Sequence, residues 1–168
     1  MADVPKYYWD ACIWIELITQ ADADRVERCR YVVDLANRGD AEVWTSAFTL
    51  AEVWKKKCDA TAVGIQKEHD RAFEDFIESE FVKKINVDVD VGNLARRLLR
   101  LHAGLGKPQD AVHVASCLLA NLDELHTFDG SDLLKFDGVL PRRDKAKLRI
   151  CAPPLPPEPE MFPDADKD

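Results

Sequence analysis

Short apolar runs alternate along the chain with longer segments in which apolar residues recur at helical spacing. The runs predict five short strands, at residues 7–9, 42–45, 84–87, 123–127 and 148–150. The helical stripes predict helices at residues 11–18, 22–38, 47–58, 65–81, 90–103, 108–120 and 131–136. Strands that alternate with helices are typical of an α/β fold. We therefore expect a three-layer sandwich with a central, mostly parallel five-stranded sheet flanked by helices.

This pattern ends at the proline-rich segment that begins at Pro153. From Glu158 to Asp168 the chain holds five acids and one lysine. Such a composition cannot bury enough apolar surface to form a core. We expect one folded domain over residues 1–152 and a disordered, acidic, proline-rich tail over residues 153–168.

The composition is ordinary for a globular protein, with 46% hydrophobic and 32% charged residues. The net charge is −8, but the tail carries much of it, so bulk charge decides little about a nucleic-acid partner. No apolar run is long enough to cross a membrane, and the first residues do not form a signal peptide. We therefore expect a cytoplasmic protein without a membrane partner. The five cysteines are scattered, which argues against a disulfide framework and a structural zinc site.

One carboxylate lies inside the apolar run from Tyr7 to Ile15. Asp10 follows the first predicted strand and precedes the first predicted helix. A carboxylate in apolar surroundings must be paired, protonated or bound to a cation. It can also cap the helix that begins at Ala11, and the two roles are compatible.

Three further acids lie at unexpected places. Glu52 is the only acid of a mostly apolar helix, although Thr49 and Lys56 one turn away would also fit a solvated face. Asp110 opens an apolar helix, where the helix dipole alone would favour an acid. Asp129 follows the fourth strand, where it could simply form a turn.

The predicted topology brings these acids to one edge of the sheet. Asp10 and Asp129 follow strands, Glu52 is on the helix after the second strand, and Asp110 opens the helix before the fourth. The carboxyl ends of parallel strands meet at one edge, where sites form. Converging carboxylates repel one another unless a cation neutralises them, and oxygen ligands suit Mg²⁺ or Mn²⁺. Such a site can support hydrolysis of a phosphodiester.

The chain resembles the PIN domain, the nuclease module of the toxin subunits of VapBC-type toxin–antitoxin pairs. The segments that carry the resemblance are residues 8–14, 45–53, 110–116 and 125–129. The resemblance implies that Asp10, Glu52 and Asp110 are the three core acids that bind metal and catalyse. Asp129 would be the fourth, more variable acid, with Asp132 as its rival.

The same resemblance implies a Mg²⁺- or Mn²⁺-dependent endoribonuclease, RNA as substrate, a cognate antitoxin as partner, and a homodimer. The chain departs from the family after its first acid, where a small hydroxyl residue is common and this sequence has Ala11 and Cys12. Thr45 or Ser46 could supply the missing hydroxyl.

In the mechanism that we expect, the acids hold the cation and a neighbouring carboxylate deprotonates the attacking water. Candidate contacts to the RNA backbone are basic residues near the acids: Lys55, Lys56, Arg96, Arg97 and Lys107. His113 is expected to be a hydrogen-bonded core or surface histidine rather than a base.

Three alternatives remain. A haloacid-dehalogenase-type phosphatase would use Asp88 of the D-x-D pattern formed with Asp90, but we interpret both acids as caps of the following helix. A housekeeping PIN-type nuclease would act in RNA processing. A catalytically weak module would use the same fold to bind RNA or protein.

Overall fold

The computed structural model describes residues 4–55, 64–130 and 132–158. Its centre is a five-stranded sheet in the order β3-β2-β1-β4-β5, in which all pairs are parallel. The strands are β1 (Lys6–Trp9), β2 (Glu42–Ser46), β3 (Val82–Ile85), β4 (Glu124–His126) and β5 (Arg149–Cys151). The predicted parallel five-stranded sheet is confirmed.

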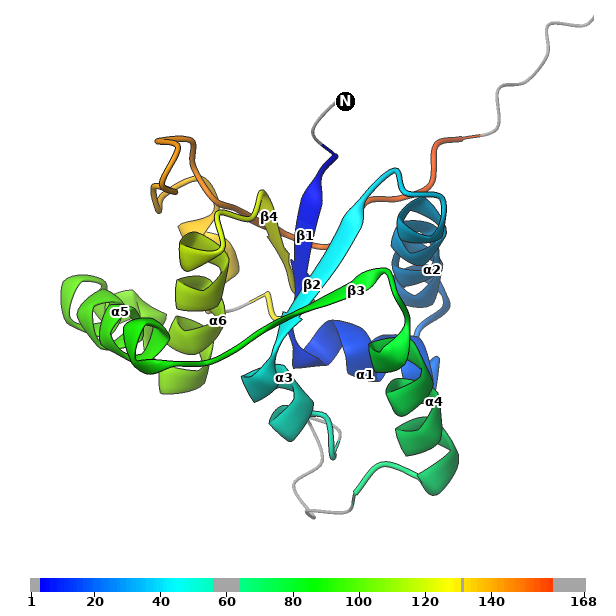
Figure 1. Ribbon diagram of the computed structural model, residues 1–168. Helices are drawn as coiled ribbons and strands as arrows, with labels where there is room; N and C mark the ends of the chain where they lie inside the picture. The colour runs from blue at the N-terminus through cyan, green and yellow to red at the C-terminus, as the bar shows by residue number, and fades with distance from the viewer. Residues whose placement is uncertain (1–3, 56–63, 131, 159–168) are drawn as a thin grey trace, which may run out of the picture.

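Helices cover both faces of this sheet, which confirms the three layers (Figure 1). They are α1 (Ala11–Thr19), α2 (Ala23–Asn37), α3 (Ala47–Glu52), α4 (Lys67–Glu78), α5 (Val89–Leu101) and α6 (Pro108–Leu119). Two short 3₁₀ turns lie in the connections: η1 (Ala103–Leu105) between α5 and α6, and η2 (Leu134–Phe136) between β4 and β5. Among the described helices, none is long and apolar enough to cross a membrane.

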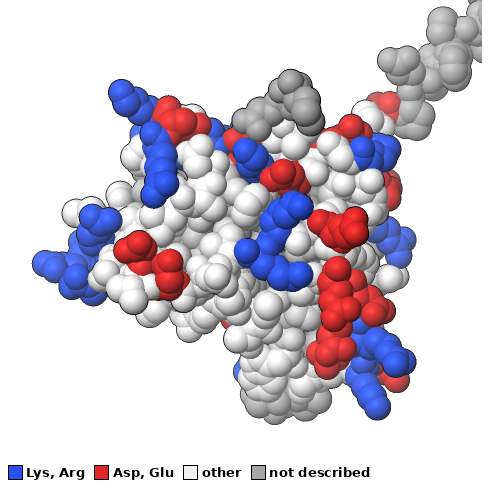
Figure 2. All heavy atoms as spheres, in the orientation of Figure 1, with Lys and Arg blue, Asp and Glu red and all other residues white. Residues whose placement is uncertain are grey.

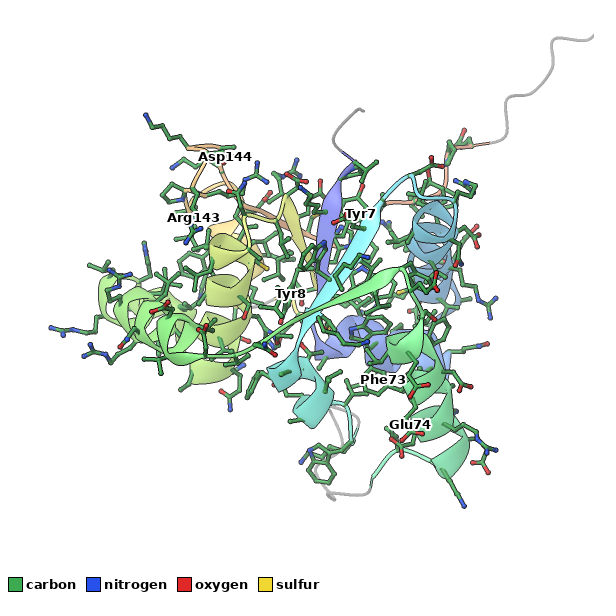
Figure 3. All side chains as sticks on the ribbon, viewed as in Figure 1. Tyr7, Tyr8, Phe73, Glu74, Arg143 and Asp144 are labelled. Atoms are coloured by element: carbon green, nitrogen blue, oxygen red, sulfur yellow. The ribbon has the colours of Figure 1, made fainter. Side chains whose placement is uncertain are left out.

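Alternation along β1 divides the interior into two cores. Successive strand side chains point to opposite faces. Tyr8 packs with α5 and α6, whereas Trp9 packs with α1, α2 and α4. Figure 3 shows Tyr8 on the side of α6 and Tyr7 on the side of α2. The strand after which Asp10 comes is therefore fixed by apolar packing on both faces.

The strand order places β1 at the centre of the sheet. From β1 the chain moves outward through β2 to β3, and then returns to the other side of β1 to form β4 and β5. Ligand sites of open α/β sheets form where the strand order reverses, at the carboxyl ends of the strands. Asp10 comes directly after β1 and therefore lies at this point.

Several predicted boundaries are wrong. The helix expected over 65–81 is Lys67–Glu78, and of the helix expected over 131–136 the described residues form only the 3₁₀ turn η2. The helix expected over 47–58 ends at Glu52, and Val53 and Trp54 form a turn; the rest of the expected helix, 56–58, lies outside the described residues. The strand expected at 84–87 lies two residues earlier, because Val82 pairs with Val43 in the sheet and α4 must end before it. Val87 is then 38% exposed instead of buried.

The chain continues in contact with α2 beyond the expected domain boundary. Pro153 is buried, and its carbonyl oxygen accepts a hydrogen bond of 2.8 Å from Arg28 Nη1. Pro156 lines a hollow beside α2. The rest of the expected tail, 159–168, lies outside the described residues, and the division at residue 152 stays a prediction.

Candidate active site

Three of the four predicted acids line one pocket at the carboxyl ends of the strands. Asp10 reaches it from the start of α1, Glu52 from the end of α3 and Asp110 from the first turn of α6. The pocket has a volume of about 380 Å³. Side chains more than 40 residues apart in sequence therefore share one pocket, as we expected from the predicted order of strands and helices.

Asp10 is 5% exposed and does cap α1. Its Oδ1 accepts hydrogen bonds from the backbone N–H groups of Cys12, at 3.0 Å, and Ile13, at 3.3 Å. The thiol of Cys12 donates a third, at 2.8 Å. Burial raises the pKa of this thiol well above its usual range, and the charge of Asp10 raises it further, so the thiol keeps the proton that it donates.

Cys12 thus donates to Asp10 near the position where the resemblance implies a small hydroxyl residue. It also accepts a hydrogen bond of 3.1 Å from the backbone N–H of Phe128, which ties α1 to the segment after β4. Thr45 and Ser46, the candidates from sequence, are engaged elsewhere. Thr45 donates to the carbonyl oxygen of Trp9, and Ser46 caps α3.

Asp110 is also 5% exposed. It lies in the first turn of α6, where Pro108 occupies the first helical position. Unsatisfied N–H groups at a helix start create a positive potential that favours a carboxylate. Asp110 therefore occupies a position of α6 that suits an acid.

Glu52 has a partner that the sequence did not reveal. Its Oε2 lies 2.8 Å from Nε2 of His113, which is one turn after Asp110 on α6. The other ring nitrogen of His113, Nδ1, lies 2.8 Å from the hydroxyl oxygen of Tyr8. The expectation of a hydrogen-bonded core histidine is confirmed, since the side chain of His113 is 5% exposed.

Asp129 and Asp132 lie at the rim of the site rather than in it. Neither contributes to the pocket lining among the described residues. Asp132 accepts a hydrogen bond of 2.6 Å from Nζ of Lys107, which lowers the pKa of Asp132 and raises that of Lys107. Asp110 and Asp129 add smaller electrostatic contributions to that rise. The choice between Asp129 and Asp132 as the fourth acid therefore stays a prediction.

The structure separates the basic residues that were expected to contact RNA. Lys55 and Lys107 line the pocket. Arg96 and Arg97 are exposed on α5 and do not line the pocket. Figure 2 shows basic side chains gathered over α5, at the left of the view. Lys56 lies outside the described residues.

Trp54 was not singled out from the sequence, yet it also lines the pocket. Its side chain is 50% exposed, and Nζ of Lys55 lies 4.8 Å from the centroid of its ring. An exposed tryptophan beside the acids could have been noticed only if the helix had been predicted to end at Glu52.

The acid of the phosphatase alternative is a helix cap, as we interpreted it. Asp88 Oδ1 accepts hydrogen bonds of 3.0 Å from the backbone N–H groups of Asp90 and Val91. Asp88 does not line the pocket. This geometry favours a structural role for the D-x-D pattern.

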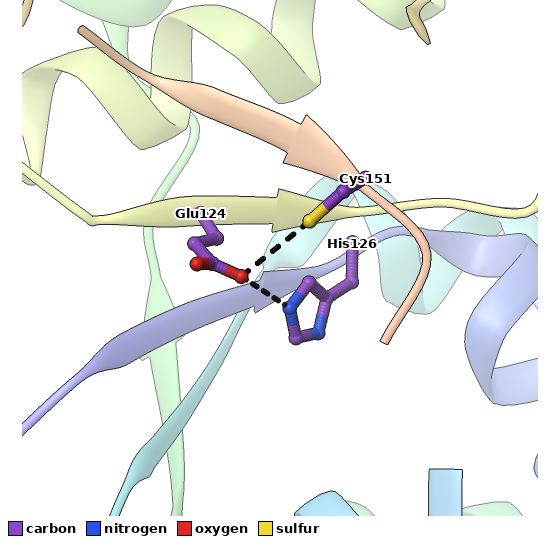
Figure 4. Close-up of side chains that lie close together, drawn as sticks. All are labelled: Glu124, His126 and Cys151. Carbon is purple, nitrogen blue, oxygen red and sulfur yellow. Dashed lines mark hydrogen bonds and ion pairs between the residues drawn. The ribbon is translucent and has the colours of Figure 1, made fainter. Parts of the chain in front are cut away.

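A second cluster of possible metal ligands lies between β4 and β5 (Figure 4). Glu124 Oε2 lies 3.0 Å from Nε2 of His126 and 3.5 Å from Sγ of Cys151. Nδ1 of His126 accepts a hydrogen bond from the indole of Trp9, which can only donate. Burial lowers the pKa of His126, so the neutral ring carries its proton on Nε2.

A metal at Nε2 would force that proton onto Nδ1, against the indole N–H of Trp9. Burial also raises the pKa of the Cys151 thiol to about 12, which disfavours the thiolate that a metal needs. The cluster is therefore better explained as a hydrogen-bonded link between strands.

Comparisons with known proteins agree with the architecture. No curated protein matches the chain at a significant level of sequence similarity. Among solved structures, the Sarcin-Ricin loop cleaving toxin VapC20 of Mycobacterium tuberculosis is 21% identical, with a TM-score of 0.56, over 74% of this chain and 90% of that chain. VapBC2 of Rickettsia felis, bound to a promoter DNA fragment, is 16% identical, with a TM-score of 0.56, over 86% of this chain and 98% of that chain.

A toxin–antitoxin complex of Klebsiella pneumoniae is 18% identical, with a TM-score of 0.53, over 76% of this chain and 89% of that chain. At these identities the three structures support the fold. The family model of the PIN domain matches residues 7–138. This match runs from Tyr7 in β1 to beyond β4 and includes every acid of the candidate site, so the chain belongs to the PIN domain family.

Proposed function

We propose that the chain is a Mg²⁺-dependent endoribonuclease that hydrolyses RNA phosphodiester bonds, with Asp10, Glu52 and Asp110 as metal ligands. The observation that carries this proposal is the convergence of the three acids in one pocket. Mn²⁺ could replace Mg²⁺, and Asp129 would complete the site.

The donor set suits a hard divalent cation. The three acids offer carboxylate oxygens, the ligands that Mg²⁺ and Mn²⁺ prefer. The hydrogen bonds of the Asp10 cap all end on Oδ1, so the cap and a metal can use different oxygens. When bound, the cation supplies Lewis-acid chemistry that activates water and neutralises charge at the phosphate.

The remaining steps fall to side chains of the pocket. The ammonium group of Lys55 lies where it can hold a phosphate oxygen of the RNA, and that of Lys107 can do so in place of its ion pair with Asp132. A carboxylate of the acid cluster accepts the proton of the attacking water. Asp10 and Asp110 are each 5% exposed, and their burial strengthens electrostatic contacts to them.

We further propose that the chain is the toxin of a type II toxin–antitoxin pair, acts in the cytoplasm and is restrained by a cognate antitoxin. Support comes from PIN family membership and from the fold shared with VapC20 and with two complexes of such systems. Homodimerisation stays a prediction. A housekeeping RNA-processing nuclease is the second candidate, and a weak RNA- or protein-binding module is the third.

Removal of the metal tests the proposed chemistry. A chain treated with a chelator is expected to cleave no RNA, and added Mg²⁺ or Mn²⁺ is expected to restore cleavage. Mg²⁺ at about a hundred times its dissociation constant should also stabilise the chain by about 2.7 kcal/mol, measured by thermal unfolding. Asp110→Asn should abolish that stabilisation. Cleavage that persists in the chelator would contradict the metal site.

Trp54 offers an aromatic face for an unstacked base of the substrate. Stacking of a base on such a ring contributes about 1–3 kcal/mol. Trp54→Ala is expected to weaken binding of a single-stranded RNA oligonucleotide by about five- to a hundredfold, measured with a chelator so that no cleavage occurs. Trp54→Phe should retain most of the affinity. Leu101→Ala is the control, since Leu101 is 77% exposed on α5 and away from the pocket. Equal affinities for Trp54→Ala and wild type would exclude this contact.

A further inference from the structure

A buried chain of hydrogen bonds leads from the pocket into the core. It begins at Oε2 of Glu52, passes through both ring nitrogens of His113, and reaches the hydroxyl of Tyr8 on β1. That hydroxyl donates to Oγ of Ser46, at 2.8 Å, and lies 3.2 Å from Oγ1 of Thr49. These hydrogen bonds therefore join α3 and α6 to β1 and β2.

This chain of hydrogen bonds starts at Glu52, a residue type with many rotamers, and ends at the buried ring of Tyr8. The side chain of Glu52 is 26% exposed and belongs to the last residue of α3. Tyr8 is fully buried in the core beneath α5 and α6. Holding a glutamate in one rotamer costs about 1.5–2 kcal/mol of side-chain entropy. A fixed partner supplies this order before any ligand arrives.

The hydrogen bond also selects which oxygen of Glu52 is held. His113 contacts Oε2, so the carboxylate is oriented with one oxygen toward α6. His113 itself lines the pocket beside Asp110, and its ring is kept in place by Phe48 and Tyr8, with ring centroids 5.6 Å and 5.7 Å away. The ring thus has little freedom to turn.

We propose that His113 and Tyr8 are positioning residues that orient the Glu52 carboxylate for the divalent cation, and thereby set the affinity of the acid cluster for it. This inference rests on the proposed function. Hydrogen-bond partners of metal ligands typically change metal affinity by about ten- to a hundredfold when they are removed. A merely structural role for the same residues would change stability and leave metal affinity unchanged.

The experiment measures binding of Mn²⁺ to the intact chain without RNA, from the loss of the electron paramagnetic resonance signal of free Mn²⁺. His113→Phe keeps a ring of similar size without its nitrogens, and Tyr8→Phe removes only the hydroxyl. We expect His113→Phe to weaken Mn²⁺ binding by about ten- to a hundredfold, and Tyr8→Phe to weaken it by about tenfold. His113→Gln should recover part of the affinity, because its amide can donate to Glu52.

Tyr7→Phe is the matched control. Tyr7 is the neighbour of Tyr8 on β1, but its ring lies on the opposite face of the sheet, stacked on His126 with centroids 4.6 Å apart. Its loss of a hydroxyl should leave Mn²⁺ affinity unchanged. Thermal unfolding of each variant shows whether it is folded at the temperature of the measurement.

The outcomes separate this proposal from the proposed function. If the folded His113→Phe and Tyr8→Phe variants bind Mn²⁺ like wild type, the positioning role is wrong while the metal site stands. If only His113→Phe fails to fold, Tyr8→Phe alone decides by the same criterion. If wild type binds no Mn²⁺, or if Asp10→Asn binds as much Mn²⁺ as wild type, the proposed metal site is wrong. The positioning role is then overturned as well.

Discussion

Asp10→Asn is expected to lower the rate of RNA cleavage by about a thousandfold and to leave the chain folded. The Lewis-acid contribution of a bound cation is several kcal/mol, and each 1.36 kcal/mol corresponds to a factor of ten in rate. Asparagine keeps an oxygen at the position of Oδ1, so it can still accept from the N–H groups of Cys12 and Ile13. It removes the negative charge that the cation needs.

The substitution therefore separates the two roles of Asp10. Without a cation the three carboxylates repel one another, so loss of one buried negative charge removes repulsion. The melting temperature of metal-free Asp10→Asn should therefore equal or exceed that of the metal-free wild type. Cleavage of an RNA substrate with Mg²⁺, together with thermal unfolding after chelation, measures both effects. In growing cells, expression of wild type should slow growth and expression of Asp10→Asn should not.

Asp88→Asn is the matched control, because Asp88 caps α5 through the same pattern of two backbone N–H groups. It should leave cleavage unchanged. If Asp10→Asn cleaves as fast as Asp88→Asn, the nuclease site is not at Asp10. If Asp88→Asn alone loses an activity on phosphate esters, the phosphatase alternative gains support.

Trp14→Ala is expected to destabilise the chain by about 3–5 kcal/mol, a large part of the 5–15 kcal/mol that holds a typical domain folded. Trp14 is fully buried on α1. Its ring packs edge-on against Trp9, at 4.8 Å between centroids, and against Phe73 of α4, at 5.8 Å. Its indole N–H donates to Oγ1 of Thr45, at 3.3 Å. Truncation to alanine removes the contacts that join α1 to the sheet and to α4.

Urea denaturation of the metal-free chain measures this cost as a lower midpoint. Trp54→Ala serves as the comparison, because Trp54 is half exposed and its loss leaves no buried cavity. A cost for Trp14→Ala no larger than that for Trp54→Ala would contradict the packing described for α1. Since Asp10 begins the same helix, the destabilised variant should also bind Mg²⁺ more weakly.

Much of the fold follows from local patterns. The apolar run before Asp10, the stripe of α2 and the proline that opens α6 placed those elements within one or two residues of their observed bounds. The pattern failed where tertiary pairing chose between neighbouring registers. Residues 81–87 contain apolar side chains at several spacings, and pairing of Val82 with Val43 selected one of them.

The candidate site divides in the same way. The sequence predicted that Asp10, Glu52 and Asp110 would meet, because Asp10 follows a strand, Glu52 is on the helix after the second strand and Asp110 opens a helix. It left Asp129 and Asp132 as rivals. The structure pairs Asp132 with Lys107, 25 residues away, and neither Asp129 nor Asp132 lines the pocket among the described residues.

The sequence by itself determined the order of the elements, the parallel sheet and the acids at one edge of it, because periodicity and capping are properties of neighbouring residues. Only the tertiary structure decided that Cys12 meets Phe128, and that His113 joins Glu52 to Tyr8 across separations of 61 and 105 residues. Periodicity tells which face of an element is buried. It does not tell which buried groups meet, because that depends on the rotation and packing of whole elements against one another.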